Sequence, residues 1–410
     1  MNSILKGLRI VESPAFVAAP LGGMTLAQLG ANVIRVDPIG GGVDSRRWPV
    51  TKEGKSLYWV GLNKGKRSLA IDTTKPEGRE IASALVTQPG QDRGIFVTNF
   101  PQSSWFKYDK LRERREDLIM VNLVGSSDGT SAVDYTVNCA VGFPFVTGQV
   151  PGRAGSSRVN HVLPAWDAIC GLNVALAVLA AERYRHRTGQ GQLVKMALSD
   201  IAFSMVGNLG YIAEVQINNE DRRSYGNYLY GAYGSDFETK DGRFLYIVVV
   251  TTRMWEELGK VTGLANRFKA LEEALGVNLL KEGERFKASE AISAIIRPWI
   301  AARTLAEIRL AFGVSGICWG PYQTFRQMLT EDARCSIQNP LFSELEQPGI
   351  GRFLVPGSPL DFSACPRETP KRAPLLGEHT DEILSQDLGL SETEIGRLHD
   401  RKIVAGPVGQ

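Results

Sequence analysis

The chain has 410 residues, of which 43% are hydrophobic and 22% are charged, so it has a globular composition and room for two or three domains. Its 47 Lys and Arg residues nearly balance 44 Asp and Glu residues. The resulting net charge of +3 excludes an extended nucleic-acid-binding surface. Five cysteines without CxxC spacing and four histidines without HExxH spacing carry no disulfide or metal signature, so we expect no metal site.

Neither a signal peptide nor a membrane-spanning segment is expected from the sequence. The first nine residues lack the long apolar run of a signal peptide. The longest apolar stretch, 168–181, contains Asn173 and falls short of the ~20 residues that a bilayer crossing needs. We therefore expect a cytoplasmic protein that contacts no membrane.

Strand-like and helix-like segments alternate through the first third of the chain. A helix is expected over 19–30, and another begins at Pro76, where proline occupies its favoured first helical position. Short apolar runs that predict strands lie at 8–12, 32–37, 68–72, 94–98 and 118–123. This alternation predicts an α/β fold with a mostly parallel, buried sheet.

The remainder of the chain predicts a long helix and a second domain. Residues 167–187 are rich in Ala and Leu and apolar nearly all round, which indicates a core helix. A strand at 244–250 and later helical segments favour a smaller α+β domain over residues 221–333. Residues 1–220 and 334–410 would then form the large domain, and a helix is expected near 392–398.

The sequence of the turn after the first expected strand argues against a nicotinamide dehydrogenase. Residues 12–20 lack GxGxxG, and no GxxxxGK[ST] occurs anywhere in the chain. Two other loops have the composition of ligand-binding loops. Residues 62–68 carry three cations that suit phosphates, although a solvated basic turn explains them equally simply. Asn99 and Phe100 follow a strand, where open α/β sheets bind ligands, but an ordinary polar loop would look the same.

Asp167 is the strongest candidate for a nucleophile. It stands at the expected start of the long helix, where a helix N-terminus keeps a carboxylate ionised and presents amide donors to an oxyanion. An Asp at this position also serves simply as an N-cap, and that alternative stays open on local grounds.

Taken together, ordered segments along nearly the whole chain resemble the family III CoA transferases. The resemblance rests on LKGLRIVE at 5–12 and on a set of further segments in the order typical of the family. These segments are 23–37, 44–47, 62–72, 98–100, Asp167, RTGQGQ at 187–192, 241–242 and APLLGEHT at 373–380.

The resemblance implies a Rossmann-like large domain, a smaller inserted domain and an interlocked homodimer. It implies that Asp167 is the catalytic aspartate and that the substrate is an acyl-CoA thioester, with no separate cofactor because CoA is part of the substrate. The residues that match CoA-binding regions of the family are Phe16, Val17, Ala18, Arg47, Asn63, Lys66, Arg67, Asn99 and Phe100.

Departures from the common family pattern narrow the expected activity. Residues 124–130 replace a GFGxxGP-like stretch, and Val133-Asp134 stands where racemases of this fold carry a His–Asp pair. These departures are typical of a subgroup that moves CoA between the two carboxyl groups of one dicarboxylic acid. Transfer between two different acids and a non-catalytic CoA-binding protein are the alternatives.

Overall fold

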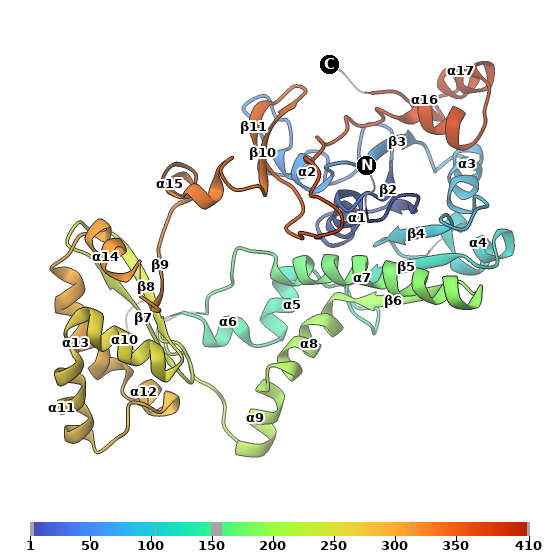
Figure 1. Ribbon diagram of the computed structural model, residues 1–410. Helices are drawn as coiled ribbons and strands as arrows, with labels where there is room; N and C mark the ends of the chain where they lie inside the picture. The colour runs from blue at the N-terminus through green and yellow to red at the C-terminus, as the bar shows by residue number, and fades with distance from the viewer. Residues whose placement is uncertain (1–3, 103, 149–157, 314, 408–410) are drawn as a thin grey trace. The chain divides into compact units, whose positions relative to one another are not determined.

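The structure is a computed structural model, and it describes residues 4–102, 104–148, 158–313 and 315–407 (Figure 1). The chain forms two compact units. Unit 1 comprises Met1–Val141, His161–Asn218 and Ala333–Gln410, and unit 2 comprises Gly142–Asn160 and Asn219–Asp332. Unit 2 thus includes a segment, Gly142–Asn160, that the sequence-based division placed in the large domain.

A seven-stranded sheet forms the centre of unit 1. Its strands are β1 (Arg9–Ser13), β2 (Asn32–Asp37), β3 (Arg67–Ile71), β4 (Ile95–Thr98), β5 (Ile119–Val124), β6 (Gln192–Ala197) and β12 (Val404–Ala405). They lie in the order β12-β3-β2-β1-β4-β5-β6, and every pairing is parallel except that of β12 with β3. The predicted α/β fold with a mostly parallel sheet is therefore confirmed.

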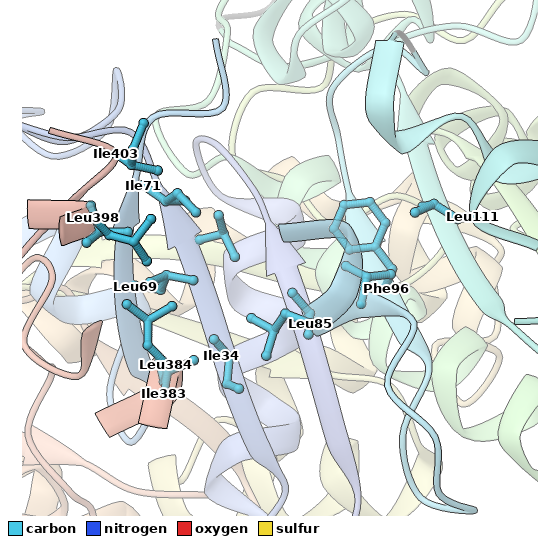
Figure 2. Close-up of a cluster of buried hydrophobic side chains, with 14 of the residues drawn as sticks. Ile34, Leu69, Ile71, Leu85, Phe96, Leu111, Ile383, Leu384, Leu398 and Ile403 are labelled. Carbon is cyan, nitrogen blue, oxygen red and sulfur yellow. The ribbon is translucent and has the colours of Figure 1, made fainter. Parts of the chain in front are cut away.

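Helices cover both faces of this sheet. The helices of unit 1 are α1 (Ala18–Gln28), α2 (Leu57–Leu62), α3 (Pro76–Val86), α4 (Tyr108–Arg114), α5 (Asp134–Ala140), α7 (Ala165–Thr188), α8 (Leu198–Asn208), α9 (Tyr211–Asn218), α16 (Thr380–Glu382) and α17 (Glu392–Asp400), and α9 extends from α8 without covering the sheet. Figure 2 shows the apolar cluster on one face, where Leu85 from α3 and Leu398 from α17 meet strand side chains. On the other face α1 and α7 pack over Ile10, Val33 and Val121.

Helix α7 lies close against α1 because glycines remove side chains at the crossing. A Cβ at Gly22 would lie 2.6 Å from Val174 Cγ1, and one at Gly171 would lie 2.8 Å from the Ala18 carbonyl oxygen. The expectation that α7 is buried all round is wrong for the single chain, since Leu172 and Leu176 are 57% and 63% exposed. By length and composition alone α7 would also suit a membrane span, which is weak evidence because core helices share these properties.

Unit 2 has its own sheet and core. Its strands are β7 (Tyr233–Glu238), β8 (Phe244–Val249) and β9 (Cys318–Pro321), which are antiparallel. Its helices are α6 (Phe143–Val146), α10 (Thr252–Thr262), α11 (Ala265–Leu275), α12 (Glu282–Lys287), α13 (Ser289–Ala301), α14 (Leu305–Phe312) and α15 (Phe325–Glu331). Ile292, Ile296 and Ile300 on one face of α13 are fully buried against the sheet. A separate hairpin, β10 (Phe342–Gln347) with β11 (Gly351–Pro356), belongs to unit 1.

Candidate active site

The candidate site lies where four adjacent parallel strands of unit 1 end. Phe16 follows β1, Arg47 lies in the connection from β2 to α2, Asn99 follows β4, and Asp134 follows β5. The strand order reverses between β1 and β4, because chain order runs outward from β1 to β3 on one side and from β4 to β6 on the other. Open α/β sheets bind ligands at such a switch point, beyond the carboxyl ends of the strands.

Asp167 is the third residue of α7 rather than its N-cap, which is Pro164 and forms no side-chain cap. The alternative that Asp167 merely caps the helix is therefore wrong. A carboxylate from another helix takes that role, because Asp134 Oδ2 accepts a hydrogen bond of 2.9 Å from the backbone N–H of Asp167. The carboxylate of Asp167 is thus available for other chemistry.

Helix α5 positions the start of α7 through two further hydrogen bonds. Trp166 Nε1 donates to Asn138 Oδ1 at 3.0 Å, and the Tyr135 hydroxyl donates to the Val162 carbonyl oxygen at 3.2 Å. Trp166 and Asn138 are buried, so this connection is shielded from water. Together with the Asp134 bond, these contacts fix the backbone that carries the proposed nucleophile.

The electrostatic surroundings of Asp167 differ from those expected of a helix N-terminus. Burial and the nearby charge of Asp134 raise the pKa of Asp167 to about 6, while Arg47 opposes the shift. The carboxylate is still mostly ionised at pH 7. A raised pKa also makes a carboxylate a stronger nucleophile, since basicity and nucleophilicity rise together in one class of group.

Arg47 is exposed, lies over two aromatic rings and acts electrostatically on Asp167. Its guanidinium carbon lies 5.2 Å from the centroid of the Phe16 ring and 5.5 Å from that of Tyr58. Burial raises the pKa of Tyr58 to about 12, so this hydroxyl stays protonated at neutral pH. Sequence reasoning missed Tyr58, because nothing in its local pattern distinguishes it from a packing residue at the start of α2.

The loop that carries Phe16 is fixed by Asn99. The Asn99 side chain accepts a hydrogen bond from the Ala15 N–H and donates one to the Ala15 carbonyl, both at 2.8 Å. Phe16 then adopts φ of 64°, a left-handed conformation that is rare for a bulky residue and is typical of functional sites. The ring of Phe16 remains 40% exposed, as does that of Phe100. Val17 and Ala18, at the start of α1, are buried.

Three of the predicted CoA-binding residues have internal partners. Asn63 and Lys66 are buried, and Lys66 Nζ donates to Glu12 Oε1 at 2.5 Å and to Asn63 Oδ1 at 2.9 Å. Arg67 forms ion pairs of 2.8 Å with Asp387 and Glu382 near the C-terminus. The structure therefore brings Phe16, Arg47, Asn99 and Asp167 together and gives Asn63, Lys66 and Arg67 internal partners.

Metal binding finds no support in this part of the molecule. No group of three or more His, Cys, Asp or Glu side chains with metal-site geometry occurs within residues 4–102, 104–148, 158–313 and 315–407. What the site does offer is a largely buried carboxylate with a raised pKa and a cation that acts on it electrostatically. The fold and this set of residues are compatible with a class of protein, the α/β enzymes that transfer acyl groups, in which a carboxylate can serve as nucleophile.

Comparisons with known proteins agree with this class. The model of "CoA-transferase family III" matches residues 5–380, so the chain belongs to that family. The chain is 58% identical over 408 residues to the 2-methylfumaryl-CoA isomerase of Chloroflexus aurantiacus, covering 99% of both chains. It is 27% identical to a formyl-CoA:oxalate CoA-transferase of Rhodopseudomonas palustris, again over 99% of both. A crystal structure of a CaiB/BaiF family protein from Brucella suis matches the fold with a TM-score of 0.75 at 23% identity, covering 94% of this chain and 100% of that chain.

Proposed function

We propose that this protein is a 2-methylfumaryl-CoA isomerase, which moves CoA from carbon 1 to carbon 4 of one mesaconate unit. The observation that carries the proposal is full-length identity of 58% to an isomerase of that name. The largely buried carboxylate of Asp167, with its raised pKa, supports the proposal, because it can serve as the covalent relay of an intramolecular transfer.

The first half of the reaction moves CoA from the substrate to the enzyme. The Asp167 carboxylate attacks the thioester carbonyl, the C–S bond breaks, and a mixed anhydride and CoA thiolate form. The thiolate then attacks the aspartyl carbonyl of the anhydride. This step breaks the bridging C–O bond and leaves an aspartyl-CoA thioester with free mesaconate dianion.

The second half returns CoA to the other end of the same acid. The second carboxylate of mesaconate attacks the aspartyl-CoA carbonyl and expels the thiolate, which then attacks the mesaconyl carbonyl of the new anhydride. The product is the carbon-4 thioester, and the Asp167 carboxylate is regenerated. Bonds broken and formed are of the same kinds, so no ATP, metal or separate cofactor is needed. Water must be excluded, because anhydrides and thioesters hydrolyse.

CoA binding is assigned to the loops around the switch point. The loop of Phe16, Val17 and Ala18 and the pair Asn99 and Phe100 lie beyond β1 and β4, where a pantetheine arm can approach Asp167. Asn63, Lys66 and Arg67 support the same region from within, since their side chains have internal partners. The cytoplasm supplies such acyl-CoA substrates, and we place the enzyme there.

A homodimer is the assembly that we propose. In the single chain, apolar side chains of α7, α8 and α9 are exposed, among them Leu176 (63%), Phe203 (49%) and Ile217 (81%). Burial of this surface by a second copy would remove it from water. Light scattering on the purified protein should give twice the mass of the chain, and a monomeric mass would contradict the assembly.

Isotope labelling tests the function and separates it from transfer between two acids. The carbon-1 thioester of mesaconyl-CoA is incubated with the protein in the presence of ¹³C-labelled free mesaconate. We expect the carbon-4 thioester to form without label, since the acid never leaves the site. Labelled thioester would show intermolecular exchange, and absence of any carbon-4 product would refute the proposal.

A further inference from the structure

Two arginines near β2 have opposite environments. Arg35 is fully buried, and its guanidinium forms ion pairs with Asp37 at 2.8 Å and Asp44 at 3.0 Å. Arg47 forms no ion pair with any Asp or Glu within the part of the chain that the structure describes; its described neighbours are two aromatic rings. The first arginine is therefore neutralised by direct ion pairs, whereas the guanidinium of Arg47 acts electrostatically on Asp167 but forms no ion pair among the described residues.

The backbone of Arg47 is nevertheless fixed. Its N–H donates to the Asp44 carbonyl at 3.2 Å, and Asp44 is itself held by Arg35. Its carbonyl accepts a hydrogen bond of 2.6 Å from Ser56 Oγ, and the same hydroxyl caps α2 by accepting from the Trp59 N–H at 3.0 Å. The guanidinium thus extends from an anchored segment, which distinguishes it from an ordinary mobile surface arginine.

Two aromatic rings flank the Arg47 guanidinium. Phe16 holds one ring in position through its strained backbone, with φ of 64°, and Tyr58 supplies the other from α2. Arg47 is also the cation that acts electrostatically on the Asp167 carboxylate. The strained backbone of Phe16, together with a cation that forms no ion pair among the described residues, is typical of a site that binds an anion.

The proposed reaction supplies an anion of matching geometry. When one end of mesaconate is bound to sulfur or to Asp167, the other end is a free carboxylate, and the released acid carries two. Resting on the proposed function, we propose that Arg47 is the specificity-determining residue that binds the substrate's free carboxylate and retains the dicarboxylate while it turns. A planar guanidinium offers two parallel N–H donors, which match the two oxygens of a carboxylate.

The family resemblance places Arg47 in a CoA-binding region, and a contact between Arg47 and a CoA phosphate would make the opposite prediction. The phosphates of CoA are separated from its sulfur by the whole pantetheine arm, whereas Arg47 interacts electrostatically with Asp167 at the sulfur end. If Arg47 held phosphate, its loss would weaken the binding of free CoA. If it holds the acyl carboxylate, its loss leaves the binding of free CoA unchanged.

The experiment compares Arg47→Met and Arg47→Lys with the wild-type protein in three measurements. These are interconversion of the two mesaconyl-CoA thioesters, calorimetric binding of free CoA, and acylation of Asp167 by 2-butenoyl-CoA, which lacks the second carboxylate. For Arg47→Met we expect kcat/KM for interconversion to fall about 10- to 100-fold, the loss of one charge-assisted carboxylate contact. We expect CoA affinity and 2-butenoyl acylation to stay within about twofold of the wild type. Arg47→Lys should be intermediate, because it keeps charge but not the two-pronged geometry.

Arg46→Met is the matched control. Arg46 is the adjacent arginine, exposed like Arg47, and it lines a separate cavity of about 590 Å³ with Lys55 and Trp59. We expect this variant to leave all three measurements unchanged. Parallel losses of interconversion and CoA affinity in Arg47→Met, or unchanged interconversion, would overturn the Arg47 inference alone. Absence of interconversion by the wild-type protein would overturn the proposed function, and this inference with it.

Discussion

Two groups of buried polar and charged side chains lie in unit 1, and they differ in whether their charges form ion pairs. The first is an internal network, in which Lys66 is ion-paired with Glu12 and Arg35 with Asp37 and Asp44, although Glu12 Oε2 accepts no hydrogen bond among the described residues. The second is the candidate site, where Asp134 Oδ1 is buried without a hydrogen-bond partner among the described residues and Asp167 has a raised pKa. Buried opposite charges in direct contact indicate a structural role, whereas buried carboxylates without an ion pair indicate a site that can bind a ligand.

The largest expected effect concerns the candidate site. Asp167→Asn keeps the shape of the side chain but removes the nucleophilic oxygen, and we expect interconversion to fall by at least about 10³-fold. Product analysis by chromatography measures this, and free CoA should still bind. Asp200→Asn, an exposed aspartate on α8, is the control. Retention of more than a tenth of the wild-type activity would reject the nucleophile.

The internal network should respond in stability instead. Lys66→Met leaves the fully buried Glu12 without its cation, and breaking one partner of a buried pair costs about 3–5 kcal/mol. Denaturant unfolding measures this loss, and the double variant Glu12→Gln with Lys66→Met should recover part of it. A Lys66→Met protein of unchanged stability but weakened CoA binding would return Lys66 to the role of a direct CoA contact.

Asp134→Asn sharpens the comparison within the site. The amide retains an acceptor for the Asp167 N–H but removes the charge that raises the Asp167 pKa, which should therefore fall from about 6. Because the deprotonated form is active, the acid limb of the kcat profile should move to lower pH, with a slower rate on the plateau. Rate measurements from pH 4.5 to 8 test this, and an unshifted acid limb would show that Asp134 acts only on structure.

The smallest expected effect is a gain in the stability of the Asp167→Asn variant. Burial raises the folded-state pKa of Asp167 to about 6, so the folded state binds the proton more tightly than the unfolded state. This contribution favours folding at low pH and is lost as pH rises from about 4 to 6. Asp167→Asn, inactive by the first prediction, should consequently be about 1 kcal/mol more stable at pH 7, after allowance for partial exposure. Thermal unfolding of the two proteins checks the sign, and lower stability of the variant would contradict it.

Local patterns in the sequence predicted most of the parallel strands, because short apolar runs bounded by turns define a buried sheet. The strand expected at 118–123 is observed at Ile119–Val124, and the helix expected from Pro76 spans Pro76–Val86. The two-residue strand Val404–Ala405 was missed, since its pairing with β3 joins segments more than 300 residues apart. Pairing of that kind leaves no local pattern.

The candidate site, too, has features that the sequence predicted and features that it did not. Asp167 and the loops after β1 and β4 follow from local position and family resemblance. The role of Asp134 as the cap of Asp167 does not, because the two residues lie 33 positions apart on different helices. Lys66 and Arg67 were assigned to CoA from the basic loop and the family resemblance, and their partners Glu12 and Asp387 come from distant segments. The sequence shows that a cation is present, but only the fold shows whether another side chain already forms an ion pair with it.

The most direct measurement of the central claim is mass spectrometry of the wild-type protein quenched with hydroxylamine during turnover of mesaconyl-CoA. A covalent relay through Asp167 predicts a hydroxamate on that side chain and on no other carboxylate, and none when substrate is omitted. Interconversion of the two thioesters with Asp167 unmodified under the same quench would contradict the account.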